Sequence, residues 1–412
     1  MSSVVPENIN TTSLGEVLQT IEGGGTPSRN NSLFWGDEIP WATVKDLKDV
    51  RLTETQESIT RIGLNGSSSR IIPKGTVIIA TRMAVGKAVT FDRDVSINQD
   101  LKALFPKDCL DSEYLLQWFL HNKDLIAALG TGSTVKGVRL EVLKGLPFLS
   151  PPLPEQKKIA SILTSVDEVI ENTQKQIDKL QDLKKATMNE LLTKGIGHTE
   201  FKDSELGRIP RSWEVVKFDE ITKSITCGVA ATPDYVESEE GVPFLSAQNV
   251  QKGSVVLKTF KHISPEFHLQ LTKNTKPESG DILYSRVGAG YGEAAVVNFN
   301  WEFSVYVSLT LIKLKPSCNN HFYQYFLNSR LGKDQAKAGV FAGGGVPNLN
   351  VGVVKEFVVL VPPIDEQNQI ALTILSIDKS ISFQRNKLHQ TQSLKKSLMQ
   401  DLLTGKVRVS VH

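Results

Sequence analysis

The sequence predicts an α+β protein with an internal pseudo-twofold repeat: two mixed α/β domains, each followed by a long helix, with the two helices packed as an antiparallel coiled coil. Three observations lead to this prediction. A segment near the middle of the chain returns near its end, both copies carry heptad-spaced apolar residues, and the segments before them alternate short β-branched runs with Gly-rich loops. With 412 residues, 40% of them hydrophobic, the chain is long enough for several packed domains.

The repeat is clearest where Pro-Pro-Leu-Pro-Glu-Gln at 151–156 returns as Pro-Pro-Ile-Asp-Glu-Gln at 362–367, an offset of 211 residues (362 minus 151). The same offset carries the Leu-Leu-Thr at 191–193 onto the Leu-Leu-Thr at 402–404. A gap-free match of this length is very unlikely by chance, so the chain consists of two related halves.

The repeated segments predict long helices at 151–196 and 362–412. Thr173 and Gln384 interrupt their apolar series at equivalent places, which could set the register of the pairing. Two matching helices in one chain favour antiparallel packing against each other, and a dimerisation coiled coil is the alternative. The heptad-spaced residues are Ile159, Leu163, Val166, Ile170, Ile177 and Leu180 in the first copy and Ile370, Ile374, Ile377, Ile381 and Leu388 in the second.

The segments 1–150 and 197–361 predict two mixed domains, the second preceded by a linker. Their repeat is looser: Ile39-Pro-Trp corresponds to Val242-Pro-Phe, an offset of 203 residues (242 minus 39). Short strands, a small helix and Gly-rich loops follow in the same order in both segments. The two helices are therefore more alike than the two domains.

Composition excludes several classes of protein. The three cysteines, Cys109, Cys227 and Cys318, lie too far apart in sequence for a disulfide framework or a zinc knuckle. No leader-like start and no membrane-length apolar run occur, so we expect a cytoplasmic protein. The net charge is only +2, with 16 basic and 17 acidic side chains in 1–154 and 17 of each in 195–362, so charge alone does not indicate nucleic acid.

Catalytic patterns are missing from the sequence. None of the seven histidines stands in H-E-x-x-H spacing, no G-x-S-x-G elbow occurs, and there is no Asn-Pro-Pro-aromatic or Asp-Pro-Pro-aromatic tetrapeptide of the kind used in amino methylation. The Gly-rich run after Arg286 resembles a cofactor loop, but the first half keeps only Gly86 there. We therefore expect no catalytic residue, no metal and no cofactor in this chain. An enzyme with its active site between the two domains is the alternative.

The chain resembles the specificity subunit of type I restriction-modification systems over essentially its whole length. The resemblance rests on the two Pro-Pro-x-x-Glu-Gln segments, each of which opens a long helix ending in Leu-Leu-Thr. It rests also on the linker from Phe201 to Val216, which looks like the family's entry to its second domain. The order of these motifs and their double occurrence make the resemblance specific.

The resemblance implies two target-recognition domains, each reading one half of a bipartite target in double-stranded DNA, with the paired helices setting the unread spacer. It also implies that two methylation subunits, which carry S-adenosylmethionine, dock on the helices, and that restriction (motor-nuclease) subunits complete the complex. The specificity subunit is non-catalytic in that family. The alternative is a coiled-coil assembly scaffold without direct base reading. Apolar positions off the paired helix faces are the candidates for partner contact: Ile162, Val169 and Leu192.

Two arginines are candidate DNA contacts because they end equivalent predicted strands. Arg82 closes the run Gly-Thr-Val-Ile-Ile-Ala-Thr-Arg, and Arg286 closes Gly-Asp-Ile-Leu-Tyr-Ser-Arg with one residue of slippage. Arginine is the best donor to guanine or phosphate, and a structural ion pair is the alternative role. The loops that follow add Lys87 and Tyr291.

Four further candidates follow the Pro-aromatic strands and differ between the two domains, as readers of two different half-sites should. Thr43 and Lys45 stand in the first domain, and Gln248 and Asn249 in the second. Amide side chains suit adenine, whereas lysine suits guanine or phosphate. A solvated strand end is the alternative.

Gly-rich loops supply the last candidates. Ser133 and Lys136 lie in the loop of the first domain, and Asn348 lies in its counterpart. Backbone N–H groups, hydroxyls and a lysine could hold a phosphate, although the lysine does not directly follow a glycine as it does in a Walker loop. A simple tight turn is the alternative.

Overall fold

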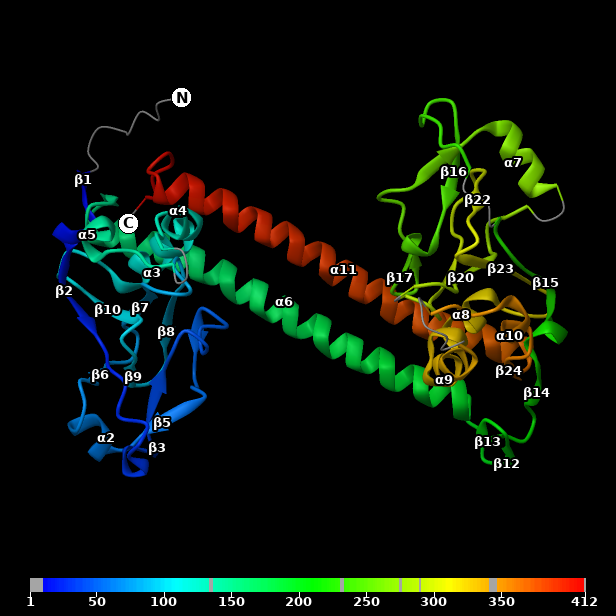
Figure 1. Cartoon of the computed structure of the whole chain (residues 1–412), viewed down its shortest axis with the longest axis horizontal. Helices are drawn as coiled ribbons and strands as arrows, with labels where there is room; N and C mark the ends of the chain where they lie inside the picture. The colour runs from blue at the N-terminus through cyan, green and yellow to red at the C-terminus, as the bar shows by residue number, and fades with distance from the viewer. Residues whose placement is uncertain are drawn as a thin grey trace. The chain divides into compact units, whose positions relative to one another are not determined.

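The computed structural model describes residues 10–132, 136–229, 233–273, 276–288, 290–340 and 347–410. The chain divides into two compact units (Figure 1). Unit 1 comprises Met1–Lys175 and Arg385–His412, and unit 2 comprises Gln176–Gln384. Each unit therefore contains one half of both long helices. The predicted boundaries instead gave each helix a segment of its own, and the difference arises because each half-helix packs into the core beside it.

Unit 1 contains two main sheets, in which most neighbouring strands are antiparallel. The first has the strand order β2 (Leu18–Gly23), β10 (Leu101–Pro106), β7 (Val77–Ala80), β8 (Ala88–Phe91) and β4 (Arg51–Leu52). The second has the order β5 (Glu57–Ile59), β3 (Trp35–Ala42), β9 (Val95–Ile97) and β6 (Ile71–Ile72), with β3 and β9 parallel. The remaining elements are β1 (Asn10–Ser13) paired with β11 (Pro147–Ser150), and the helices α1 (Leu14–Val17), η1 (Ser32–Phe34), α2 (Arg61–Asn65), α3 (Ser112–His121), α4 (Lys123–Ala128) and α5 (Leu140–Lys144).

Unit 2 repeats this topology. Its larger sheet has the order β15 (Thr222–Cys227), β23 (Leu309–Leu314), β20 (Ile282–Ser285) and β21 (Ala294–Val296). Its smaller sheet has the order β19 (Lys261–Ile263), β16 (Val242–Leu245) and β22 (Ser304–Val305), with β16 and β22 parallel. The remaining elements are the pairs β12 (Phe201–Ser204) with β13 (Gly207–Pro210), β14 (Glu214–Lys217) with β24 (Val358–Val361) and β17 (Val250–Gln251) with β18 (Ser254–Val255), and the helices η2 (Phe218–Ile221), η3 (Ala247–Asn249), α7 (Pro265–Thr272), α8 (Asn320–Asn328), α9 (Arg330–Gly339) and α10 (Val351–Lys355).

The long helices α6 (Leu153–Lys194) and α11 (Ile364–Leu403) run antiparallel within each unit. In unit 1 the start of α6 packs with the end of α11, since Ile159 and Leu163 share a buried cluster with Met399 and Leu402. In unit 2 the start of α11 packs with the end of α6 in the cluster that includes Ile370, Ile374 and Leu192. The predicted α+β repeat with antiparallel helices is confirmed.

The glutamine of each Pro-Pro-x-x-Glu-Gln motif ties the start of its helix to the adjoining domain. The Gln156 side chain is fully buried; its Oε1 accepts from the backbone N of Asp111 (2.9 Å), and its Nε2 donates to the carbonyls of Cys109 (2.9 Å) and Pro151 (2.8 Å). Asp111 is the N-cap of α3, so one amide side chain joins two helix starts. Gln367 makes the same links to Asn319, the N-cap of α8 (2.9 Å), and to Pro362 (2.8 Å).

The glutamate of each motif holds the segment that follows the other long helix. In unit 1 the Glu155 carboxylate accepts from both Nε (2.7 Å) and a terminal nitrogen (2.6 Å) of Arg408, which lies beyond the end of α11. In unit 2 Glu366 accepts from the backbone N of Ile196 (2.9 Å) and the indole of Trp213 (2.9 Å), and it also contacts His198 (2.8 Å). Each motif therefore holds the start of one long helix and the segment that follows the end of the other.

A lysine–aspartate pair joins the two helices in each unit. In unit 2 the Nζ of Lys184 on α6 lies 2.6 Å from Oδ1 of Asp378 on α11. In unit 1 the Nζ of Lys395 on α11 lies 2.5 Å from Oδ1 of Asp167 on α6. Both pairs are related by the 211-residue offset of the repeat. Each ion pair forms only when the end of one helix lies beside the start of the other. The pairs therefore favour the antiparallel arrangement within each unit.

The substitution Gln156→Ala is expected to lower the free energy of unfolding by about 1–3 kcal/mol, because it leaves a buried backbone N–H and two carbonyls without partners. Urea titration of the full chain measures the change. Gln181→Ala on the exposed face of the same helix is the matched control and is expected to stay within about 0.5 kcal/mol. An equal loss of unfolding free energy in both variants would show that the hydrogen bonds of Gln156 do not hold the helix start to the domain.

Candidate nucleic-acid interface

In unit 1 a buried carboxylate organises the loop that follows β3. Asp46 is 6% exposed, and its Oδ2 accepts from the backbone N (2.8 Å) and the hydroxyl (3.0 Å) of Thr43. Its Oδ1 accepts from the backbone N of Gln56 (2.7 Å). Because the Asp46 carboxylate accepts three hydrogen bonds from the loop, it holds the loop in one conformation.

In unit 2 an asparagine performs the same task after β16. Asn249 stands 203 positions after Asp46 (249 minus 46) and is 3% exposed. Its Oδ1 accepts from the backbone N of Ser246 (3.0 Å), and its Nδ2 donates to the carbonyls of Val256 (2.9 Å) and Thr259 (2.8 Å). The prediction that Asn249 contacts a base is wrong, because its amide is buried and fully used within the loop.

Each of these anchored loops has an exposed side chain directly before its buried anchor. Lys45 is exposed beside Asp46, and Gln248 is exposed beside Asn249. Thr43 is half-buried and spends its hydroxyl on Asp46, so it supports the loop. Of the four predicted readers, Lys45 and Gln248 have exposed side chains, and their contact with DNA stays a prediction.

The two predicted arginines do not occupy equivalent positions. The backbone N of Val138 donates to the carbonyl of Thr81 (2.9 Å) in unit 1, and the backbone N of Leu349 donates to the carbonyl of Arg286 (2.8 Å) in unit 2. Arg286 is therefore equivalent to Thr81, one position before Arg82. A shift of one residue in an extended segment turns a side chain to the opposite face.

The consequence is that the two arginines have different roles. Arg286 is 9% exposed, and its guanidinium donates to the carbonyl of Leu349 (2.9 Å) and to Oδ1 of Asn348 (3.1 Å). Arg82 has 57% of its side chain exposed and lies 3.6 Å from Asp100. The prediction of a DNA contact is wrong for Arg286, which is structural, and it stays open for Arg82.

The Gly-rich loops lie against the loops that contain these arginines. In unit 1 the backbone N of Met83 donates to the carbonyl of Lys136 (2.9 Å), and in unit 2 Val287 bridges Asn348. The side chains of Lys136 and Asn348 are exposed. Two predicted contact segments therefore meet in each unit, while Ser133 lies outside the described residues.

The last two predicted contacts have partners of their own. The ammonium of Lys87 donates to the carbonyl of Leu47 (2.6 Å), which places it beside the anchored loop of unit 1. Tyr291 is half-buried and packs against the core of unit 2. Lys87 thus lies next to the candidate reader, whereas Tyr291 contributes mainly to packing.

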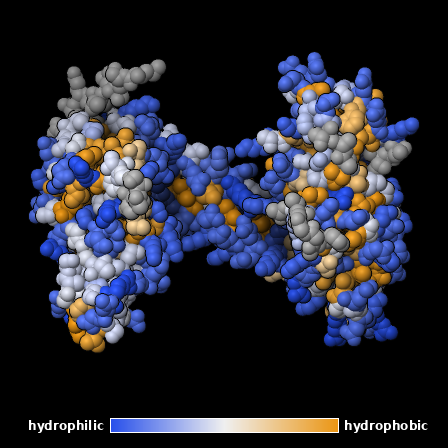
Figure 2. All heavy atoms as spheres, viewed as in Figure 1, coloured by the Kyte–Doolittle hydropathy of each residue, from blue (hydrophilic) through white to orange (hydrophobic). Residues whose placement is uncertain are grey.

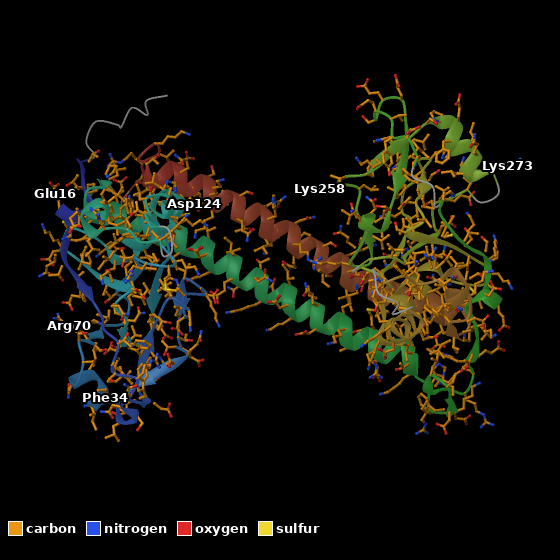
Figure 3. The ribbon with its side chains drawn as sticks, viewed as in Figure 1. Glu16, Phe34, Arg70, Asp124, Lys258 and Lys273 are labelled. Carbon is orange, nitrogen blue, oxygen red and sulfur yellow. The ribbon has the colours of Figure 1, made fainter. Side chains whose placement is uncertain are left out.

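Two cavities flank Gln248 in unit 2, and sequence reasoning did not find them. The first, of about 400 Å³, is lined by Tyr235, Phe244, Phe260, Lys261 and Tyr306 together with Gln248 and its loop. The second, of about 540 Å³, is lined by Gly288, Gly290 and Ser308, again with Gln248 and Tyr306. Lys258 stands on the loop that leads into the first cavity (Figure 3) but is not part of its lining. The aromatic residues come from four separate segments, so no local motif identifies the site.

The predicted partner contacts differ in exposure. Val169 is 41% exposed on α6, whereas Ile162 is half-buried against the core of unit 1. The prediction for Leu192 is wrong: it is 1% exposed, because it lies between the helix pair and the core of unit 2. Figure 2 shows hydrophobic residues at the surface of the long helices among hydrophilic ones. The sequence did not indicate the other exposed apolar residues of the two helices, which are Leu183, Ile364, Leu372, Phe383 and Leu394.

Among the described residues, no group of three or more His, Cys, Asp or Glu side chains is placed to hold a metal ion. None of the helices in this part of the chain is long and apolar enough to cross a membrane.

The fold and the site define a protein with two similar recognition units on shared antiparallel helices. The family model for the type I restriction modification DNA specificity domain matches residues 6–182 and again residues 210–392. The chain therefore belongs to the family of type I restriction-modification DNA specificity proteins.

Individual relatives match over nearly the whole chain. The type I restriction enzyme MjaIX specificity subunit of Methanocaldococcus jannaschii is 25% identical over 96% of this chain and 92% of its own length. The putative type I restriction enzyme MjaX specificity subunit of the same organism is 28% identical over 98% and 95%. The crystal structure of a type I restriction-modification system S subunit from M. genitalium covers 97% of this chain and 98% of its own, at 18% identity and a TM-score of 0.63, which shows a shared fold.

The substitution Asn249→Asp is expected to lower the free energy of unfolding by about 1–3 kcal/mol, because the new carboxylate cannot donate to the carbonyls of Val256 and Thr259. The neighbouring Gln248→Glu makes the same chemical change on an exposed side chain and is the matched control, expected within about 0.5 kcal/mol. Thermal unfolding of both variants checks this. Equal stability would show that the Asn249 amide does not hold the loop.

Proposed function

We propose that this chain is the DNA-reading, non-catalytic subunit of a type I restriction-modification complex, and that each unit reads one half of a bipartite target. The observation that carries the proposal is the pair of anchored loops. Their buried anchors, Asp46 and Asn249, have the same role, whereas the exposed side chains beside them differ. A reader of two different half-sites needs a constant support and a variable contact.

The exposed side chains suggest which bases are read. Gln248 carries a donor and an acceptor on one amide, which matches the N6 and N7 edge of adenine in the major groove. Lys45 carries only donors, which match O6 and N7 of guanine or a phosphate oxygen. Arg82 and Lys136 are exposed on two loops that meet through the Arg82–Gly137 bridge, and they would contact phosphate, which fixes register rather than sequence.

The long helices are proposed to set the unread spacer and to dock two methylation subunits, one for each copy of the repeat. Exposed apolar residues that gather on the helices among hydrophilic ones (Figure 2) support this, because contiguous groups of exposed apolar side chains mark protein contacts. S-adenosylmethionine would be bound by those subunits, and restriction subunits would complete the complex. No step of the chemistry is assigned to a residue of this chain.

The near-zero net charge of +2 has a consequence for affinity. Tight binding to DNA depends largely on cationic contacts to phosphate, so the isolated chain is expected to bind weakly. The assembled complex would bind more tightly, because its partners add basic surface. Specificity would still come from the base contacts of this chain.

The substitution Lys45→Gln is expected to change the methylated motif in one half only, because it replaces a donor-only side chain by one that suits adenine. Co-expression of the chain with its methylation subunit, followed by sequencing of the modified DNA, measures the motif. Lys48→Gln, an exposed lysine of the same loop, is the matched control and is expected to leave the motif unchanged. A bipartite motif that survives Lys45→Gln would contradict the reader position, and a continuous motif would contradict the two-unit proposal.

The substitutions Val169→Asp and Leu394→Asp are expected to weaken association with the methylation subunits by roughly tenfold or more, because each places a charge on an exposed apolar position. Co-purification and analytical ultracentrifugation of the complex measure this. Lys179→Asp, on an exposed charged position of α6, controls for the charge itself. Unchanged association in both apolar variants would rule out these positions as docking sites.

A further inference from the structure

The aromatic cavity of unit 2 has a shape and chemistry that the simple reading of base edges does not require. Phe244 lies 4% exposed at one wall, and its ring meets that of Tyr306 edge to face, with centroids 5.9 Å apart. Tyr235 is 46% exposed at the mouth, where the ammonium of Lys261 lies 5.3 Å from its ring centroid. The exposed amide of Gln248 completes the lining.

In unit 1 a cation lies against the aromatic residues at the equivalent place. Trp41 stands 203 positions before Phe244, and it pairs with Glu57 across the strands just as Phe244 pairs with Lys261. The guanidinium of Arg29 lies 5.3 Å from the Trp41 ring centroid and is ion-paired with Glu57. Its hydrogen bonds lower the pKa of the Glu57 carboxyl, so the pair stays charged.

In unit 2 Tyr235 bridges Ile263 across the strands as Trp35 bridges Ile59 in unit 1, so an aromatic ring stands at this place in both units. In unit 1 the guanidinium of Arg29 lies over that ring, 3.7 Å from the Trp35 centroid. The charges are also exchanged, since Lys261 stands where unit 1 has Glu57. No arginine is among the described residues that line the cavity of unit 2, which is open beside Gln248. The two units therefore share one strand arrangement, but an ion-paired arginine lies at this place in unit 1 and an open cavity lies there in unit 2.

We propose that the aromatic cavity of unit 2 holds one nucleobase that is unstacked from the DNA target. This inference rests on the proposed DNA-reading function. A planar base stacks on aromatic side chains whatever its identity, and the Gln248 amide at the rim contacts its hydrogen-bonding edge. Lys261 at the mouth attracts the phosphate that accompanies the base.

The size of the cavity favours a whole base over a smaller group. Its volume of about 400 Å³ lies within the range of roughly 300–1,000 Å³ that is typical of sites for small-molecule ligands. A thymine methyl group in the major groove would need only a shallow apolar contact. Walls of aromatic rings from separate segments are the arrangement by which proteins hold bases outside the helix stack.

The neighbouring cavity gives the sugar–phosphate backbone of such a base a place to pass. A Cβ on Gly288 or Gly290 would meet no atom within 4 Å, so the loop is open on that side. Gly288 also adopts a φ of +86°, which favours glycine. Gln248 and Tyr306 line both cavities and so stand between the proposed positions of base and backbone.

The test uses the complex of the full chain with its methylation subunits and duplexes that carry the methylated motif. Within the half read by unit 2, the base opposite each position other than the methylated one is replaced in turn by an abasic site, because methyltransferases extrude their target base in any case. At the position whose base enters the cavity, this change removes the cost of unpairing, so binding is expected to tighten by roughly tenfold. At ordinary paired positions the same change weakens binding or leaves it unchanged.

Tyr235→Leu and Tyr306→Leu are expected to abolish that tightening, because each removes an aromatic wall or rim. Tyr235 is largely exposed, so its variant keeps the test decisive if Tyr306→Leu does not fold. Lys258→Ala, on the same loop as Phe260 but outside the lining, is the control and is expected to retain the tightening. A complex that methylates a bipartite motif but shows no tightening position would overturn this inference and leave the proposed function standing. A complex without sequence-specific binding would overturn the proposed function itself.

Discussion

The Glu-Gln pair at the start of each long helix is the contact on which the rest of the structure depends. Gln156 and Gln367 bind the helix start to the adjoining domain, and Glu155 and Glu366 bind the segment beyond the end of the other helix. Burying these side chains is costly unless every polar atom has a partner, so each motif fits only one arrangement of its neighbours. That requirement explains why the motif recurs unchanged in a chain whose domains have diverged.

The helix pair and the anchored loops divide structure from recognition. Where a polar side chain is buried, the two units keep its role, as Asp46 and Asn249 do with different chemistry but the same result. Where a side chain is exposed at the same place, the units differ, as Lys45 and Gln248 do. Packing constrains the first group and leaves the second free, so a second unit can acquire a new contact without rebuilding its fold. The place at which Arg29 lies against aromatic rings in unit 1 and a cavity is open in unit 2 is a further case of that freedom.

Much of the fold was predictable, because the spacing of apolar residues indicates long helices and a constant offset between similar segments indicates a repeat. The 211-residue offset predicted both helices. Gly195 and Gly405, which follow the helix ends, adopt left-handed φ values of +65° and +73°. The candidate site was predictable only in part. Alignment by residue type paired Arg82 with Arg286, yet the backbone hydrogen bonds set them one position apart, on opposite faces of the extended chain. Sequence also could not distinguish the exposed Val169 from the buried Leu192, since both are apolar positions on one helix.

The sequence by itself determined the two-part organisation, the helix pairing and the segments from which contacts would come, because these follow from spacing along the chain. The tertiary structure decided which side chains in those segments are free. Gln248 and Asn249 are adjacent amides, and only the carbonyls of Val256 and Thr259 decide that one is an anchor and the other is exposed. The aromatic cavity likewise combines residues from separate segments. Exposure and convergence depend on long-range packing, which no local pattern of residues records.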